Sequence, residues 1–184
     1  GFATAEADPL SPDAAVRRAA ADHLVRLAEH TASLGGEVLA GPIHSAYGRF
    51  SEQPPSADEF HRCAEVLRAA GERCKPLGVR LAVEPLNRFE CYFLNTAAAC
   101  ASLVRAVGHP NVVGALDTHH AHLEENDLID AVHAMRGTLG HVQLSETTAG
   151  RLAPALPKGQ GVTLSTAGAL DTGGDQGPRH LINP

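Results

Sequence analysis

Short apolar runs and longer amphipathic segments alternate through the first three quarters of the chain. The apolar runs have the length of buried strands and lie at residues 37–43, 79–85, 112–117 and 141–145. The segments that flank them have helical spacing and lie at residues 11–33, 57–74, 96–107 and 124–135. Because parallel strands need a crossover between them, this alternation predicts an α/β fold with four parallel strands.

Capping and helix-breaking residues mark the ends of the predicted elements. Ser11 is a candidate N-cap with Pro12 at the first helical position, and Gly35 ends that helix. After residue 151 the sequence becomes rich in Gly, Pro, Thr and Ser and offers no clear strand or amphipathic helix. We therefore predict one domain over residues 1–151 and an irregular or non-native tail over residues 152–184.

Composition indicates a globular protein with a real core, since 43% of the 184 residues are hydrophobic and 20% are charged. The net charge of −6 offers no basic surface for phosphates, so we expect a small neutral substrate and no nucleic-acid partner. No apolar run approaches the roughly 20 residues of a bilayer span and no signal peptide opens the chain, which predicts a cytoplasmic protein without membrane contact. The four cysteines form no C-x-x-C pair and are expected to be buried, reduced thiols.

Polar side chains that can bind ions stand at the ends of the three later strands. Glu84 ends the second run, Asp117 ends the third, and His141, Gln143 and Glu146 lie at the end of the fourth. The carboxyl ends of parallel strands line one mouth of an α/β barrel. These side chains are therefore expected to converge although they are distant in sequence.

Strand alternation predicts that three of these side chains point into the same mouth. Glu84, Asp117 and Gln143 each fall on the strand face opposite the residues that would meet the helices. Each residue alone fits an ordinary polar strand end. Because all three side chains fall on the corresponding face of their strands, a common site is favoured. Oxygen donors of this kind suit hard divalent cations such as Mg²⁺ or Mn²⁺.

Three histidines follow the third strand, at His119, His120 and His122. We expect all three in the loop after the strand, where His119 and His122 are solvated. Because loops at the carboxyl ends of barrel strands face the substrate, His120 is the better candidate for a functional contact.

The chain resembles the D-tagatose 3-epimerase and D-psicose 3-epimerase group of the xylose isomerase-like barrel superfamily. The matching stretches are EPLNRFE at residues 84–90, NT at 95–96, LDTHH at 116–120 and GHVQLSE at 140–146. The resemblance implies a partial (β/α)8 barrel whose four visible strands are the third to the sixth. It also implies a sugar substrate and, for the intact protein, a homo-oligomer.

The resemblance assigns roles to five residues of the site. It implies a divalent metal ion, manganese or magnesium with cobalt as a further candidate, held by Glu84, Asp117 and Gln143. Glu84 would also be the catalytic base, and Glu90 and His120 match positions that contact substrate hydroxyls. The epimerases usually have a histidine at the position of Gln143, whereas the hydroxypyruvate isomerases use glutamine there.

Two departures from the family bear on activity. The family's second catalytic glutamate has no counterpart, because no glutamate follows Glu146, and the opening of the chain resembles the region that leads into the third strand. We therefore expect a fragment, and expect the 184-residue chain by itself to be inactive or nearly so. The alternatives to a ketose 3-epimerase are a hydroxypyruvate-type isomerase, a metallonuclease of the same superfamily, and a truncated barrel without catalysis.

Overall fold

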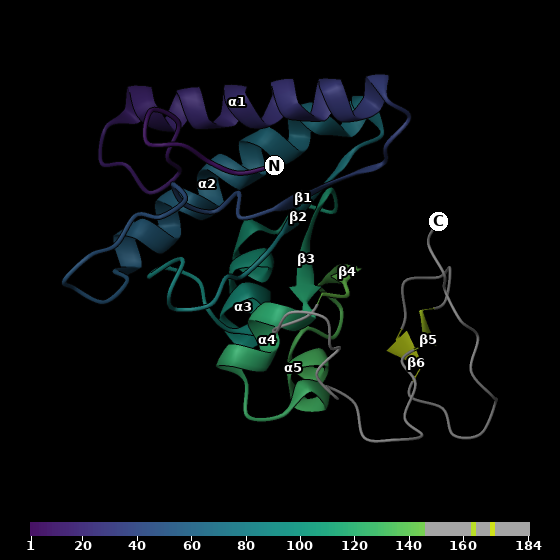
Figure 1. Cartoon of the computed structure of the whole chain (residues 1–184). Helices are drawn as coiled ribbons and strands as arrows, with labels where there is room; N and C mark the ends of the chain where they lie inside the picture. Colours follow the sequence, from purple (N-terminus) through teal and green to yellow (C-terminus); the bar gives the residue numbers. More distant parts are fainter. Residues whose placement is uncertain (146–162, 165–169, 172–184) are drawn as a thin grey trace.

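Four parallel strands form the centre of the structure, a computed structural model that describes residues 1–145, 163–164 and 170–171. The strands are β1 (Val38–Gly41), β2 (Arg80–Val83), β3 (Val112–Asp117) and β4 (Leu139–Gln143). They lie side by side in chain order, β1-β2-β3-β4, and every neighbouring pair is parallel (Figure 1). The predicted α/β fold is confirmed, and the sheet with its helices forms half of a barrel.

Among the described residues, one α-helix precedes these strands and four connect or follow them: α1 (Ala14–Ser33), α2 (Ala57–Cys74), α3 (Ala97–Val107), α4 (Thr118–Glu124) and α5 (Leu128–Ala134). A short 3₁₀ turn, η1 (Lys75–Leu77), extends α2. The helices pack in chain order, α1 on α2, α2 on α3 and α3 on α5, so that they form a layer beside the sheet (Figure 1). Leu24, Leu67, Leu81 and Leu103 fill the interface between the two layers and are at most 1% exposed.

Two neighbouring residues, Ser11 and Asp13, could each cap the start of α1. The prediction of Ser11 as the N-cap of α1 is wrong, because Asp13 caps this helix and accepts a hydrogen bond from the Ala15 N–H at 2.7 Å. Ser11 instead accepts a hydrogen bond from the Asp13 N–H at 3.2 Å. The carboxylate is the stronger acceptor of the two and lies directly before the first turn.

The helix predicted over residues 124–135 is confirmed over residues 128–134, but its predicted start is wrong, because a separate short helix, α4, occupies residues 118–124. Asp127 separates them and caps α5 by accepting hydrogen bonds from the N–H groups of Ile129 and Asp130. The histidines after β3, expected in a loop, therefore lie on α4.

Residues 163–164 and 170–171 form two short strands, β5 (Thr163–Leu164) and β6 (Leu170–Asp171), which pair antiparallel. The sequence predicts no strand after residue 151, and this expectation is wrong at these positions. The proposed boundary at residues 151 and 152 and the remainder of the tail lie outside the described residues.

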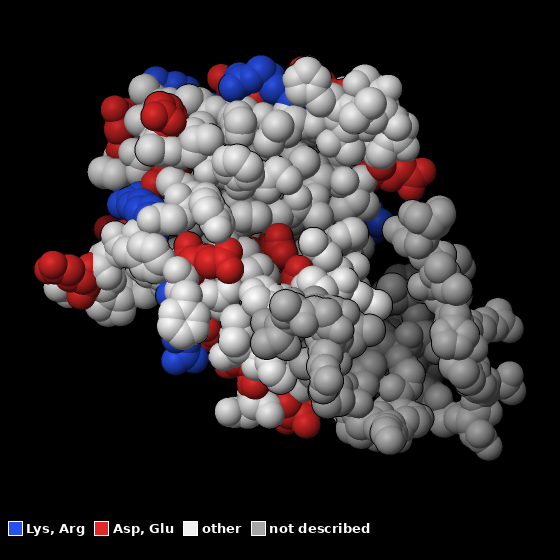
Figure 2. Space-filling view, in the orientation of Figure 1, with Lys and Arg blue, Asp and Glu red and all other residues white. Residues whose placement is uncertain are grey.

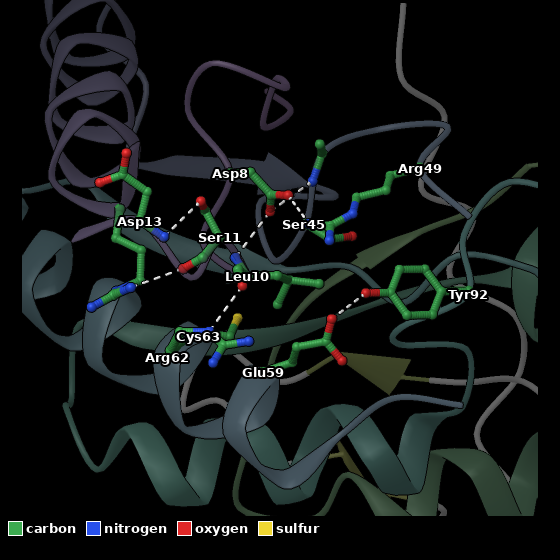
Figure 3. Close-up of polar contacts among 12 residues, drawn as sticks. Asp8, Leu10, Ser11, Asp13, Ser45, Arg49, Glu59, Arg62, Cys63 and Tyr92 are labelled. Carbon is green, nitrogen blue, oxygen red and sulfur yellow. Dashed lines mark hydrogen bonds and ion pairs between the residues drawn. The ribbon is translucent and has the colours of Figure 1, made fainter. Parts of the chain in front are cut away.

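A polar network ties the segment before α1 to the loop after β1 (Figure 3). Asp8 is 3% exposed, accepts hydrogen bonds from the backbone N–H groups of Leu10 and Ala46, and forms an ion pair with Arg49. Buried carboxylates need such partners, because an unpaired charge would be costly in this environment.

Two further expectations concern the rest of the described chain. All four cysteines are free and buried, as predicted. Within the described residues, no helix is both long enough and apolar enough to cross a bilayer.

Candidate metal and substrate site

Two carboxylates meet at the carboxyl ends of β2 and β3. Glu84 directly follows β2, and Asp117 is the last residue of β3. Val83 pairs with Gly114, so Glu84 falls opposite Ala115, which shares a strand face with Asp117. Both carboxylates are buried, with exposed fractions of 6% and 5%, and each offers an oxygen within 4.8 Å of the other.

The pair carries an excess of negative charge, which the Gly1 ammonium offsets only in part. Burial raises the pKa of Glu84 to about 7, and the Asp117 carboxylate beside it contributes to this rise. Among the described residues, none donates a hydrogen bond to the Glu84 carboxylate, and His120 Nε2 lies 3.8 Å from its Oε1 atom. A divalent cation between the two carboxylates would neutralise this charge, so the donor set fits a hard metal ion.

Asp117 is held in place by two donors on its Oδ1 atom. The N–H of His119 donates to Oδ1 at 2.7 Å, and the hydroxyl of Ser145 donates to the same atom. The first of these bonds makes Asp117 the N-cap of α4. The Asp117 carboxylate thus caps the start of α4, and the helix N-terminus in turn holds this carboxylate at the end of β3.

Gln143 lies beside Asp117 in the sheet, where the two residues are paired in register across β3 and β4. Their side chains therefore share a strand face, as alternation predicts. Gln143 is exposed, because β4 is the edge strand of the four-stranded sheet formed by the described residues. Its role as a metal ligand stays a prediction.

Glu90 and His120, the predicted substrate-binding residues, are connected by hydrogen bonds near the carboxylate pair. Glu90 accepts hydrogen bonds from the Tyr47 hydroxyl at 3.1 Å and from Asn87 Nδ2 at 2.7 Å. Burial alone would raise the pKa of Glu90, but these hydrogen bonds outweigh it and lower the pKa. Burial also lowers the pKa of His120, partly offset by Asp117 and Glu90.

The other two histidines of α4 differ from each other. His122 is exposed, whereas His119 is half-buried and packs edge to face against the His120 ring, with 5.0 Å between the ring centres. His119, His120 and Glu90 each offer one ligand atom, and these three atoms lie within 4.8 Å of one another. His119 therefore lies beside the proposed substrate-binding residues Glu90 and His120, and not in a solvated loop as expected.

Three residues of the site were not singled out from the sequence: Asn87, Tyr47 and Ser145. Asn87 lies within the EPLNRFE stretch, and asparagine is a weak turn signal because its side chain can accept a hydrogen bond from the backbone N–H two residues later. Tyr47 and Ser145 reach their partners across 43 and 28 positions of sequence. Only the folded chain brings these groups together.

The face of the molecule in Figure 2 shows how charge is distributed around the described residues. Asp and Glu side chains lie near its middle and also toward its rim, whereas the visible Lys and Arg side chains lie mainly toward the rim. One basic residue at the site, Arg88, is held by Glu124, which accepts hydrogen bonds from its Nε and Nη2 atoms. The arrangement favours a cation and disfavours an anionic ligand.

Comparison with known proteins identifies the family. Residues 2–172 match the xylose isomerase-like TIM barrel family. The chain belongs to this family. It is 36% identical to a D-psicose 3-epimerase of Agrobacterium fabrum over 74% of its own length and 48% of that protein. It is 33% identical to an L-ribulose 3-epimerase of Mesorhizobium japonicum, over 80% of this chain and 49% of that protein.

Solved members of the xylose isomerase-like family have the same arrangement of strands and helices. A crystal structure of a D-psicose 3-epimerase determined in the presence of D-fructose superposes with a TM-score of 0.73 at 34% identity. The match covers 79% of this chain and 50% of that one. The chain thus spans about half the length of the relatives it matches, which agrees with the half-barrel.

Proposed function

We propose that the protein is a divalent-metal-dependent ketose 3-epimerase that acts by proton transfer through an enediolate. The observation that carries this proposal is the pair of buried carboxylates, Glu84 and Asp117, at the mouth of the half-barrel. The 3-epimerases among the relatives support the reaction class. We further propose that the protein works in the cytoplasm and that the intact form is a homo-oligomer.

The metal ligands in this proposal are Glu84, Asp117 and Gln143, and the ion is Mn²⁺ or Mg²⁺. When bound, such an ion would polarise the carbonyl of the ketose and lower the cost of negative charge on its oxygens. Each of the three side chains offers an oxygen atom, which is the ligand type that these hard ions prefer. The two carboxylates supply the negative charge that attracts the ion, and the Gln143 amide adds a neutral donor.

Glu84 is the base that removes the carbon-bound proton in this proposal. Its pKa is about 7 in the metal-free chain, and a bound cation would lower it, so the carboxylate would be ionised and able to accept a proton near neutral pH. Glu90 and His120 bind hydroxyl groups of the sugar, and the acidic surroundings favour an uncharged polyol over a phosphorylated one.

Deuterium exchange tests the proposed chemistry on this chain. Inversion needs a second carboxylate on the opposite face of the substrate, and no such residue is assigned here. With Mn²⁺ in D₂O, we expect Glu84 to exchange the proton at carbon 3 of D-fructose or D-tagatose, with little or no net epimerisation. The readout is the loss of the carbon-3 proton signal by NMR, and Glu84→Gln should abolish it.

Hydroxypyruvate is the second substrate in the same experiment, because glutamine at position 143 resembles the hydroxypyruvate isomerases. Exchange with hydroxypyruvate and none with either ketose would contradict the epimerase proposal and favour the alternative. Equal exchange in the wild type and in Glu84→Gln would contradict the role of Glu84 as the base.

A further inference from the structure

Asn87 lies at the centre of the hydrogen bonds that connect the proposed substrate-binding residues. It follows β2 in the loop that leads toward α3 and is only 2% exposed. Its side-chain amide contacts Glu90, His120 and the backbone of Phe89. One buried amide therefore joins two groups that the proposed function uses.

The orientation of this amide follows from the chemistry of its partners. Its Oδ1 atom accepts a hydrogen bond from the Phe89 N–H at 3.0 Å, and a backbone N–H can only donate. Its Nδ2 atom lies 2.7 Å from Glu90 Oε1, and a carboxylate oxygen can only accept. Exchanging the oxygen and nitrogen would lose both bonds, so Nδ2 is the atom that faces Glu90.

The same orientation determines where the His120 ring carries its hydrogen. His120 Nδ1 lies 2.9 Å from Asn87 Nδ2 and 3.1 Å from the Asn87 backbone N. Both groups are donors only, so Nδ1 must be the acceptor. The ring hydrogen is then on Nε2, the atom that lies 3.8 Å from Glu84 Oε1.

A histidine in this state has no lone pair left for a cation. Its Nδ1 lone pair accepts from Asn87, and its Nε2 atom carries hydrogen. His120 is therefore a hydrogen-bond donor at the site, although its distance from Glu84 and Asp117 would also suit a metal ligand.

We propose that Asn87 is a positioning residue whose side-chain N–H group holds His120 as an Nε2–H donor and turns Glu90 toward the same sugar substrate. The inference rests on the proposed epimerase function and adds a residue that orients substrate contacts. The competing explanation is that Asn87 only stabilises the turn through its bond to Phe89. These two roles use different atoms of the amide and can be separated.

Asn87→Asp is the variant that separates them. Aspartate keeps the oxygen that accepts from Phe89 but has no side-chain N–H group for Glu90 or His120. Of the two donors that face His120 Nδ1, only the backbone N–H of residue 87 remains in this variant. Asn87→Ala loses both the acceptor for the Phe89 N–H and the side-chain donor to Glu90 and His120. It therefore shows the effect of losing the turn as well. Tyr47→Phe removes the other donor to Glu90 and leaves the contacts of Asn87 with His120 intact.

The first readout is the ¹⁵N NMR spectrum of the His120 ring at mildly alkaline pH, which reports which nitrogen carries hydrogen. We expect an Nε2–H pattern in the wild type and in Tyr47→Phe, and a changed pattern in Asn87→Asp. The ring of His23, which lies on α1, serves as the internal control and should not change. A wild-type pattern in Asn87→Asp would overturn the proposal.

The second readout is deuterium exchange at carbon 3 of the ketose, together with the melting temperature. Loss of a positioned donor typically costs about 100-fold in rate, so we expect a fall of this order in Asn87→Asp, measured below its melting temperature. The melting temperature itself should also fall, because the new carboxylate faces Glu90 Oε1, which lies 2.7 Å from Asn87 Nδ2. Full exchange in Asn87→Asp would overturn the proposal. If the wild type exchanges no ketose proton while the ¹⁵N pattern still changes in Asn87→Asp, the positioning of His120 stands and the proposed function fails.

Discussion

The buried Glu84 side chain favours metal binding but lowers the stability of the metal-free fold. Its carboxylate lies beside Asp117 without a hydrogen-bond donor among the described residues, and its pKa is raised to about 7 by burial and then by Asp117. The charge that would bind a metal is therefore unfavourable in the metal-free chain. Binding function and folding stability oppose each other at this residue.

This opposition predicts how stability depends on pH. The pKa of Glu84 is about 7 in the folded state against an ordinary value of 4.5, so the folded state binds more protons than the unfolded state between these two values. The metal-free protein should thus lose stability as pH rises through this window, by about 2 kcal/mol after allowance for solvent screening. Denaturant unfolding in EDTA at several pH values measures this loss.

Glu84→Gln should remove most of the pH dependence, because glutamine does not titrate. It should also raise stability above neutral pH, where the wild type carries two adjacent charges. Glu52→Gln, at an exposed position, is the control and should follow the wild type. Identical slopes for the wild type and Glu84→Gln would show that Glu84 is not the group responsible.

The sequence predicted Glu84 and Asp117 as neighbours because both end a strand of clear apolar pattern. It could not predict the role of Asn87, whose partners include His120, 33 positions away. Nor could it predict the hydrogen bond from Tyr47 to Glu90, since both residues lie in irregular loops. Strand periodicity carries information about facing residues, whereas loop contacts depend on the tertiary fold.

At the scale of elements, close packing of β3 against β4 positions Gln143. Gly140 lies on β4, and a Cβ atom added there would come within 2.6 Å of Val113 on β3. This distance is too short for any real contact, and the Val113 side chain is a branched group with little freedom to move. Glycine at position 140 therefore allows the two strands to approach.

Gly140→Ala should lower the free energy of unfolding by about 2 kcal/mol, a typical cost of overpacking. Shortening the opposing side chain in the double variant Val113→Ala with Gly140→Ala should restore most of this loss. Urea unfolding of the wild type, both single variants and the double variant measures the coupling. Strictly additive effects would contradict the proposed clash between these two residues.

Element boundaries could be predicted where capping and periodicity agree. Helix α2 begins and ends as expected, because Ser56 and Glu59 form a capping box before a clear apolar stripe. Helix α4 could not be predicted, because its seven residues include three histidines and show no apolar period. Its formation depends on Asp117, which caps it from the end of β3.

At the scale of the whole molecule, the half-barrel brings strand ends from distant parts of the sequence to one mouth. The strict alternation of strands and helices was enough to predict the parallel sheet, and the resemblance to the barrel family implied the order of its strands. The motifs around Glu84, Asp117 and Gln143 were enough to predict the family. Alternation alone does not determine which hydroxyl groups of a sugar would be recognised, because loops such as 43–56 and 84–96 form the mouth.

Binding of one divalent cation by Glu84, Asp117 and Gln143 can be measured by isothermal titration of the protein with Mn²⁺. We expect about one Mn²⁺ per chain, with a Kd raised at least about tenfold in Asp117→Asn and in Gln143→Ala. Because His120 is a donor and no ligand in this account, His120→Ala should keep the wild-type affinity. Equal Mn²⁺ affinity in the wild type and Asp117→Asn, or no binding by the wild type, would contradict the proposed metal site.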